Sequence, residues 1–370
     1  MLKHRKTLFT CALITAGLAG CGGSDNNNSA AQLPVFQSLI KVPNVGPQPG
    51  FDFDLGLVDS NSETYYLADR TNKSIDIVDA KTNTLLTQVK GYVGQLASNA
   101  NSGPNGMEVV GTRLYTGDGD STVKIIDLAS RTIVKTLPTG GTKRADAFAF
   151  DPVDNVVIVS NKNETVPFIS FIDPNTTNII GKLSIPSTQL DAVLYDPTIN
   201  KFLVSVTATT ANPGGEIDVV DPKTQKVIAV YPVTQCLPGG LALGPNEHLL
   251  VACSGDAIAA GFAAKSLILD AGTGKVLSTI TQVGGSDQAT YNSGDQRFYT
   301  ASRDMTSNGL ATGTATPVLG IIDAVNMTFV TNVATSKNSK SVAADPKNNR
   351  IFVPLTDVPG PGIGVYSANP

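Results

Sequence analysis

Five side chains whose oxygen atoms could bind a cation recur at intervals that suggest equivalent positions in a repeated unit. They are Asp54, Asn105, Asp146, Asp191 and Asp287, and the corresponding positions of two further units hold Gly239 and Lys340. In the first unit, Asp52 is the alternative to Asp54. Carboxylate and amide oxygens are the ligands that a hard cation prefers. If the fold brings these positions together, they are candidate ligands for Ca²⁺ or another divalent cation.

Three roles fit such a set. The side chains can simply be solvated, they can bind a ligand, or they can hold a metal ion for hydrolysis. Crowded carboxylates repel one another, which favours a bound cation, whereas Lys340 would offset part of their charge.

Other catalytic chemistry has little support. The sequence contains only two histidines, His4 and His248, and His248 is expected in a turn at the opposite end of its unit. A Ser-His-Asp triad therefore lacks its base. There is no Cys-x-x-Cys-His segment for covalent haem and no tryptophan for stacking on a quinone cofactor. The segment Asp118-Gly119-Asp120 is similar to half of a calcium loop, but it lacks the glutamate and the spacing of an EF-hand. We interpret it as an ordinary turn.

The elements that would position these side chains repeat seven times. A β-patterned apolar run ending in aspartate recurs, and its aspartates are Asp79, Asp127, Asp173, Asp221, Asp270 and Asp323. A seventh run, 363–366, lacks the aspartate. A spacing of 46 to 53 residues is typical of β-propeller blades. Each unit reads as four strands; in the third, they are predicted at 147–150, 156–160, 168–172 and 179–185.

The recurring aspartates have a structural interpretation. A carboxylate at a strand end accepts backbone N–H groups of the following turn. We therefore predict six turn formers rather than six catalytic acids.

The last unit ends one strand short. Segment 36–42 reads as an outer strand without partners and precedes the first innermost strand, 53–58. Pairing it with 363–366 would close the ring and remove a free sheet edge. The prediction is an all-β chain: a seven-bladed β-propeller of four-stranded antiparallel blades, closed by the N-terminal strand.

The unit at 114–127, Leu-Tyr-Thr-Gly-Asp-Gly-Asp-Ser-Thr-Val-Lys-Ile-Ile-Asp, resembles the YVTN-type β-propeller repeat. That family shares the surface-layer and quinoprotein-like propeller architecture, and the resemblance covers about 36–370. It implies a fold rather than a function. Propeller-type lactonases use a similar set of acidic and amide side chains, but this sequence lacks the Glu-Gly-Pro-like segment of gluconolactonases.

The N-terminus is read as a targeting segment. Basic residues at 3–6 precede an apolar run at 8–19 that is short for a membrane span. Leu18-Ala19-Gly20-Cys21 resembles the lipobox of bacterial lipoproteins, which implies cleavage before Cys21 and lipidation of its thiol. Gly22, where the inner-membrane retention signal has aspartate, implies the outer membrane. We predict a signal peptide at 1–20, a lipidated tether at 21–35 and the propeller at 36–370.

Export to an oxidising compartment is consistent with a disulfide between Cys236 and Cys253, the two remaining cysteines, which are expected to face each other across a hairpin. With 16% charged residues and a net charge of −4, the chain lacks the basic character of a nucleic-acid binder. Glycine- and serine-rich loops at 92–104 and 303–317 are long for the repeat and are expected on the mouth face.

The primary hypothesis is a monomeric outer-membrane lipoprotein, on the periplasmic side or the cell surface, that binds a protein or small molecule over its loop face. The alternative is a metal-dependent, lactonase-like hydrolase. Whether the chain is an enzyme stays open.

Overall fold

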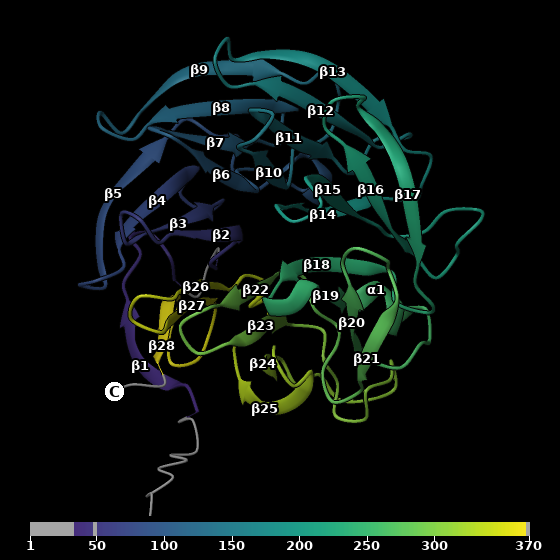
Figure 1. Ribbon diagram of the computed structural model, residues 1–370. Helices are drawn as coiled ribbons and strands as arrows, with labels where there is room; N and C mark the ends of the chain where they lie inside the picture. The colour runs from purple at the N-terminus through teal and green to yellow at the C-terminus, as the bar shows by residue number, and fades with distance from the viewer. Residues whose placement is uncertain (1–32, 47–49, 368–370) are drawn as a thin grey trace, which may run out of the picture. The chain divides into compact units, whose positions relative to one another are not determined.

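The computed structural model describes residues 33–46 and 50–367. The predicted signal peptide, Cys21 and most of the tether lie outside the described residues. Seven four-stranded antiparallel sheets are arranged as blades in a ring (Figure 1), which confirms the predicted fold. In the described part of the chain, none of the helices is long and apolar enough for a membrane span.

Each blade runs from an innermost to an outermost strand. The bounds are β2 (Phe53–Asp59), β3 (Thr64–Asp69), β4 (Ser74–Asp79) and β5 (Thr84–Lys90) in the first blade; β6 (Met107–Val110), β7 (Arg113–Gly117), β8 (Thr122–Asp127) and β9 (Thr132–Pro138) in the second; β10 (Phe148–Asp151), β11 (Val156–Asn161), β12 (Phe168–Asp173) and β13 (Asn178–Ser184) in the third; β14 (Leu190–Asp196), β15 (Lys201–Val206), β16 (Glu216–Asp221) and β17 (Lys226–Pro232) in the fourth; β18 (Pro238–Leu243), β19 (His248–Cys253), β20 (Ser266–Asp270) and β21 (Val276–Ile280) in the fifth; β22 (Ala289–Asn292), β23 (Arg297–Ser302), β24 (Val318–Asp323) and β25 (Thr328–Ala334) in the sixth; and β26 (Ala343–Asp345), β27 (Arg350–Leu355), β28 (Gly362–Ser367) and β1 (Val35–Ile40) in the seventh.

The N-terminal strand closes the ring as predicted. β1 pairs antiparallel with β28, with Phe36 opposite Tyr366 and Ile40 opposite Ile363. The aromatic rings of Phe36 and Tyr366 meet edge to face at 5.6 Å. The seventh sheet therefore combines both ends of the described chain and has the same four strands as the other six.

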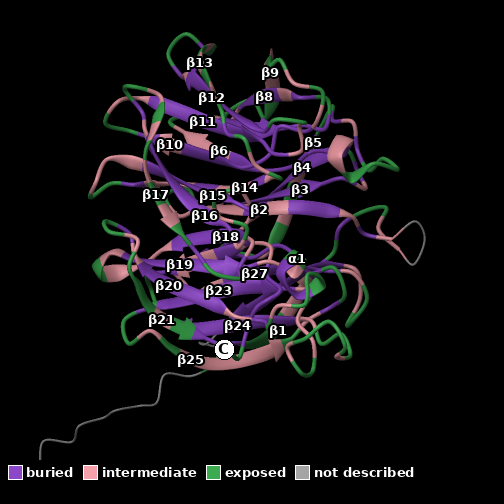
Figure 2. Ribbon diagram, turned by 90° about the vertical axis from the view of Figure 1, so that its right-hand side faces the viewer, coloured by how far each residue is buried: buried purple, intermediate pink, exposed green. Residues whose placement is uncertain are grey.

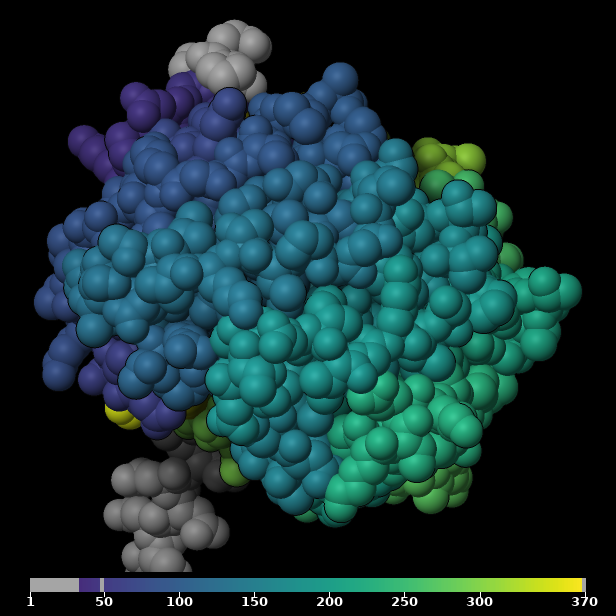
Figure 3. Space-filling model, turned by 90° about the horizontal axis from the view of Figure 1, so that it is seen from above, coloured from purple at the N-terminus to yellow at the C-terminus, as the bar shows by residue number. Residues whose placement is uncertain are grey.

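The apolar core lies between neighbouring blades. Blades one and seven share a cluster in which the Tyr65 and Phe352 rings stack with centroids 4.7 Å apart. Blades three and four share another, which includes Phe171 and Phe202. Figure 2 shows the strands largely buried and the connecting loops exposed, and Figure 3 shows the rim on which the second to fourth blades (blue to teal) adjoin. Each blade thus buries both faces against its neighbours.

The recurring aspartates end the third strand of their blades and form the predicted turns. Each carboxylate accepts backbone N–H groups two or three residues further on, at N···O distances of 2.7–3.0 Å; the six are Asp79, Asp127, Asp173, Asp221, Asp270 and Asp323. At Asp79 and Asp221, these backbone donors are the largest cause of a lowered pKa. The hydrogen bonds stabilise the ionised form and assign the six residues to turn formation.

The predicted disulfide is present. Cys236, just before β18, bonds to Cys253 at the end of β19, with Cα atoms 4.5 Å apart. Both side chains are buried in the core between the fourth and fifth blades.

One helix departs from the sequence analysis, which predicted none. The helix α1 (Gly255–Ala259) follows Cys253 and buries Ala257 and Ile258. Five residues are too few for a helical period to be recognised in a sequence. The 3-10 helices η1 (Asn99–Asn101) and η2 (Pro245–Glu247) lie in connecting loops.

Candidate functional site: the channel mouth

The predicted ring residues lie where the innermost strands begin. Asp54 and Asp191 are the second residues of β2 and β14, whereas Asn105, Asp146, Asp287 and Lys340 precede β6, β10, β22 and β26 by two or three residues. Gly239, within β18, supplies only backbone at its position. The structure therefore brings the starts of all seven innermost strands to one mouth of the ring.

Each aspartate of this ring is paired with a basic side chain. The contacts are Asp54 with Arg70, Asp146 with Arg144 (3.2 Å) and Lys162 (3.2 Å), Asp191 with Lys162 (3.0 Å), and Asp287 with Arg303 (3.3 Å). Arg144 also lies 3.6 Å from Asp54, so the pairs form a continuous network from the first blade to the fourth. The mouth is a mixed-charge site rather than an acidic one.

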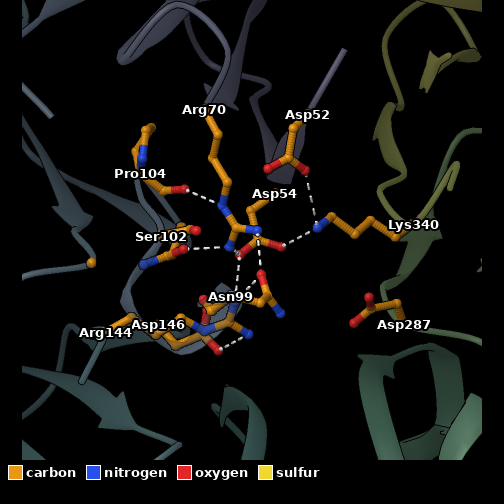
Figure 4. Close-up of polar contacts among 12 residues, drawn as sticks. Asp52, Asp54, Arg70, Asn99, Ser102, Pro104, Arg144, Asp146, Asp287 and Lys340 are labelled. Carbon is orange, nitrogen blue, oxygen red and sulfur yellow. Dashed lines mark hydrogen bonds and ion pairs between the residues drawn. The ribbon is translucent and has the colours of Figure 1, made fainter. Parts of the chain in front are cut away.

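Asp54 is at the centre of the network (Figure 4). Arg70, whose side chain is fully buried, contacts Asp54 and Asn105 through the same nitrogen, at 2.5 Å from Asn105 Oδ1. It donates further hydrogen bonds to Asn99 Oδ1 (2.9 Å) and the Pro104 carbonyl (3.2 Å). Burial would raise the pKa of Asp54, but the surrounding cations outweigh it and hold that pKa well below its usual value. Asp54 is therefore a fixed negative charge.

Asp191 is in a different electrostatic position. Burial, followed by the nearby charges of Asp287 and Asp146, raises its pKa to about 6 even though Lys162 opposes the shift. The same aspartates raise the pKa of Lys162 against its burial. Asp191 is consequently a ring carboxyl with a raised pKa, in contrast to Asp54.

These pairings bear on the metal hypothesis. That hypothesis counted only Lys340 against the repulsion between the carboxylates, whereas Arg70, Arg144, Lys162 and Arg303 add further positive charge. Across residues 33–46 and 50–367, no three or more His, Cys, Asp or Glu side chains group closely enough to hold a metal ion. The geometry supports neither a Ca²⁺ centre nor the lactonase-like alternative.

Arg70, Lys162 and Arg303 were not predicted, because only the innermost strands of the repeat were aligned. Arg70, Lys162 and Arg303 each follow the last residue of the second strand in their blades, after β3, β11 and β23. The same alignment applied to the second strands would have placed them at the mouth, since both positions face one end of the ring. Arg144 precedes Asp146 by two residues and has no repeat equivalent that marks it.

The two long loops do reach the mouth. Loop 92–104 supplies Asn99, which also lies 3.4 Å from a nitrogen of Arg144. Loop 303–317 begins with Arg303 and Asp304, which contact each other at 3.2 Å. Both loops therefore contribute polar groups beside the ring.

Two cavities open at the mouth. One of about 300 Å³ is lined by polar and charged side chains, among them Arg144, Lys162, Asp191, Asp287 and Lys340. A second, of about 420 Å³, is lined partly by Phe51, Phe53 and Leu96. Asn99, Arg303 and Lys340 line both, so the cavities adjoin. We call the 300 Å³ space the mouth cavity.

A third cavity, of about 140 Å³, lies deeper between the innermost strands. Leu55, Phe148 and Leu241 line it, together with Glu108, and it shares Asp191 and Asp287 with the mouth cavity. Burial raises the pKa of Glu108 to about 8. Glu108 was not predicted as a site residue, because an isolated glutamate in a strand carries no pattern.

His248 has a structural role in the described structure. It begins β19, is buried, and its Nδ1 lies 2.7 Å from the Ala324 carbonyl of the next blade. It belongs to the packing between the fifth and sixth blades, and the ring aspartates obtain no catalytic base from it.

These features place the chain in the class of seven-bladed β-propellers. Among solved structures it is similar to a chain described as Kuenenia stuttgartiensis hydrazine synthase, with a TM-score of 0.67 and 15% sequence identity over 89% of this chain and 98% of that chain. At this identity the similarity concerns the fold alone. No protein-family model matches the sequence, and no curated protein does.

Proposed function

We propose that the chain is a β-propeller binding scaffold of the bacterial cell envelope that takes up a small charged ligand at its channel mouth. The observation that carries this proposal is the mouth cavity, to which all seven blades or the loops that join them contribute. Its lining includes Asp54, Asn99, Arg144, Gln189, Ser254, Asp287 and Lys340. Such a cavity requires the closed ring, and its convergent polar groups are typical of a ligand site.

The proposed location rests on the N-terminal sequence. The lipobox-like segment ending at Cys21 supports an outer-membrane lipid anchor, with the propeller on the periplasmic side or the cell surface. The repeat at 114–127 supports membership of the YVTN-type propellers. A Cys21→Ala variant is expected to leave the membrane fraction, and unchanged membrane association would contradict lipidation.

The binding role is tested by competition among many small molecules. Purified propeller is dialysed against a bacterial metabolite extract, and the retained compounds are identified by mass spectrometry. The matched control is an Arg144→Met, Asp287→Asn variant with the same net charge, because one charge of each sign is removed. We expect at least one compound to be enriched by the wild type and not by the variant. No difference between the two would contradict a ligand site at the mouth.

A further inference from the structure

The mouth cavity is lined by charges of both signs, and Asp54, Asp191 and Arg303 are among them. Arg144 and Lys162 come from the third blade, whereas Asp256, Asp287 and Asp304 come from the fifth and sixth. Figure 4 places Asp287 opposite Arg144, beside Lys340. On the side of the fifth and sixth blades, which we call the acidic wall, three carboxylates face the single cation Arg303.

Lys340 is the first group whose partners are distant, because it makes only long ion pairs. The residue is 7% exposed, and its ammonium lies 3.7 Å from Asp54 and 3.8 Å from Asp52, too far for a hydrogen bond. Within the described residues the ammonium donates no hydrogen bond to any other acceptor. Its ammonium therefore keeps donor capacity for a ligand. Burial is also the largest cause that lowers the pKa of Lys340, to about 8.

Arg144 is the second basic residue of the mouth cavity with a donor left for a ligand. It is 5% exposed, and its Nε is buried without a hydrogen-bond partner, although its other two nitrogens are engaged with Asn99 and Asp146. Both Arg144 and Lys340 line the mouth cavity. An anionic group of a ligand would supply the acceptors that these donors lack.

The acidic wall has too little positive charge. Asp287 and Asp304 share Arg303, at 3.3 and 3.2 Å. Asp256 makes no ion pair with any described residue. Burial is the largest cause that raises the pKa of Asp191, and the nearby charge of Asp287 adds to it. A ligand ammonium at this wall would offset the repulsion between the carboxylates.

We propose that the mouth cavity binds a small zwitterion, a free α-amino acid, with its carboxylate toward Lys340 and Arg144 and its ammonium toward Asp287 and Asp256. This inference rests on the proposed binding function and names its ligand class. A purely anionic or purely cationic ligand would satisfy one wall and leave the other uncompensated. The volume of about 300 Å³ is at the small end of ligand pockets, which is sufficient for an amino acid.

The test uses the wild-type propeller and the standard set of proteinogenic L-amino acids, each at millimolar concentration and near pH 7. Binding is measured by calorimetry and by the shift in melting temperature. The amino acid that binds best is then compared with its N-acetyl derivative, which keeps only the carboxylate, and its amide, which keeps only the ammonium. We expect each derivative to bind at least about tenfold more weakly, a loss of about 1.4 kcal/mol.

Variants locate the site. Lys340→Met is expected to weaken binding about tenfold or more, and Asp287→Asn to do the same, while Lys340→Arg retains part of the affinity. Lys226→Met, an exposed position on the outer strand β17, is the control and should leave binding unchanged. Because the derivatives are tested on wild-type protein, the comparison stands even where a variant folds poorly.

The outcomes separate the two proposals. If a derivative binds as tightly as its parent, or if no amino acid binds, the zwitterion proposal is wrong. In either case the binding function survives if the metabolite extract yields another ligand that depends on the mouth residues. The proposed binding function is contradicted when dialysis against the metabolite extract enriches no compound on the wild type relative to the variant.

Discussion

Gln288 and Gly56 join the sixth blade to the first across the closing seventh blade. The side-chain amide of Gln288 donates to the Gly56 carbonyl (2.8 Å), and its Oε1 accepts the Gly56 N–H (3.3 Å). The same oxygen accepts from Ser341 Oγ (2.8 Å) and from the Val342 N–H (3.1 Å) in the seventh blade. One side chain thus satisfies backbone groups of the innermost strands on both sides of the closure.

Replacing this side chain should weaken the ring. Gln288→Ala leaves the Gly56 and Val342 backbone groups unsatisfied, and we expect a loss of about 1–3 kcal/mol in the free energy of unfolding. Gln288→Glu should not recover this loss, because a carboxylate only accepts hydrogen bonds and would place a charged oxygen against the Gly56 carbonyl. Chemical denaturation measures both. Equal stability of wild type and Gln288→Ala would show that water replaces the amide at no cost.

The Arg70–Asp54 pair should be among the most sensitive positions of the mouth. Arg70→Met removes the main partner of a buried carboxylate, and we expect a loss of about 3–5 kcal/mol in unfolding free energy. Adding Asp54→Asn should recover part of it, since the uncompensated charge is then gone. Lys81→Met, whose exposed ammonium lies 3.8 Å from Glu63, is the control and should change stability by less than about 1 kcal/mol. A similar loss of stability in Arg70→Met and Lys81→Met would contradict the prediction that burial makes the Arg70–Asp54 pair the more sensitive of the two.

The disulfide should stabilise the fifth blade. Replacing Cys236 and Cys253 together with serine opens a link between residues 17 apart, which on a chain-entropy argument costs roughly 3 kcal/mol. Denaturation with and without reductant checks this. Reductant should lower the midpoint of the wild type and leave the double variant unaffected. Two alkylatable thiols in protein exported to the periplasm would mean that the bond does not form there.

Glu108 should make the stability fall as pH rises. Its pKa is raised from an ordinary value of 4.5 to about 8, so its full contribution to stability is present below about pH 4.5 and is lost as the pH rises through 8. Glu108→Gln should therefore be more stable than wild type at pH 8, by on the order of 2 kcal/mol, and similar to it near pH 4.5.

Glu164 provides an internal comparison for this prediction. Backbone N–H groups of Lys143 and Thr142 lower its pKa despite partial burial, so its contribution is present above about pH 4.5 and is lost as the pH falls. Glu164→Gln should consequently be less stable than wild type at neutral pH. Melting curves from pH 4 to 8 distinguish the two signs. A Glu108→Gln curve parallel to that of the wild type would contradict the raised pKa.

The sequence by itself determined the repeat, the strands and the turns, because these depend on local physics. The alternation of apolar residues marks a strand within a few positions, and an aspartate such as Asp79 forms its turn with N–H groups three residues away or fewer. The disulfide was also predictable, since Cys236 and Cys253 flank one hairpin. Even the pairing of β1 with β28 followed from a missing strand at one end and a surplus strand at the other.

The tertiary structure alone decided the chemistry of the mouth. Whether Asp54 belongs to an acidic cluster or to an ion pair depends on Arg70, which arrives from a different strand, and on Lys340, which lies 286 residues further along the chain. Charges of both signs converge there because seven blades meet at one axis, and electrostatic energy depends on distances in space. The position of Gln288 between three blades has the same cause. Neighbouring residues in the sequence carry no record of these distances, so the mixed-charge cavity emerges only from the closed ring.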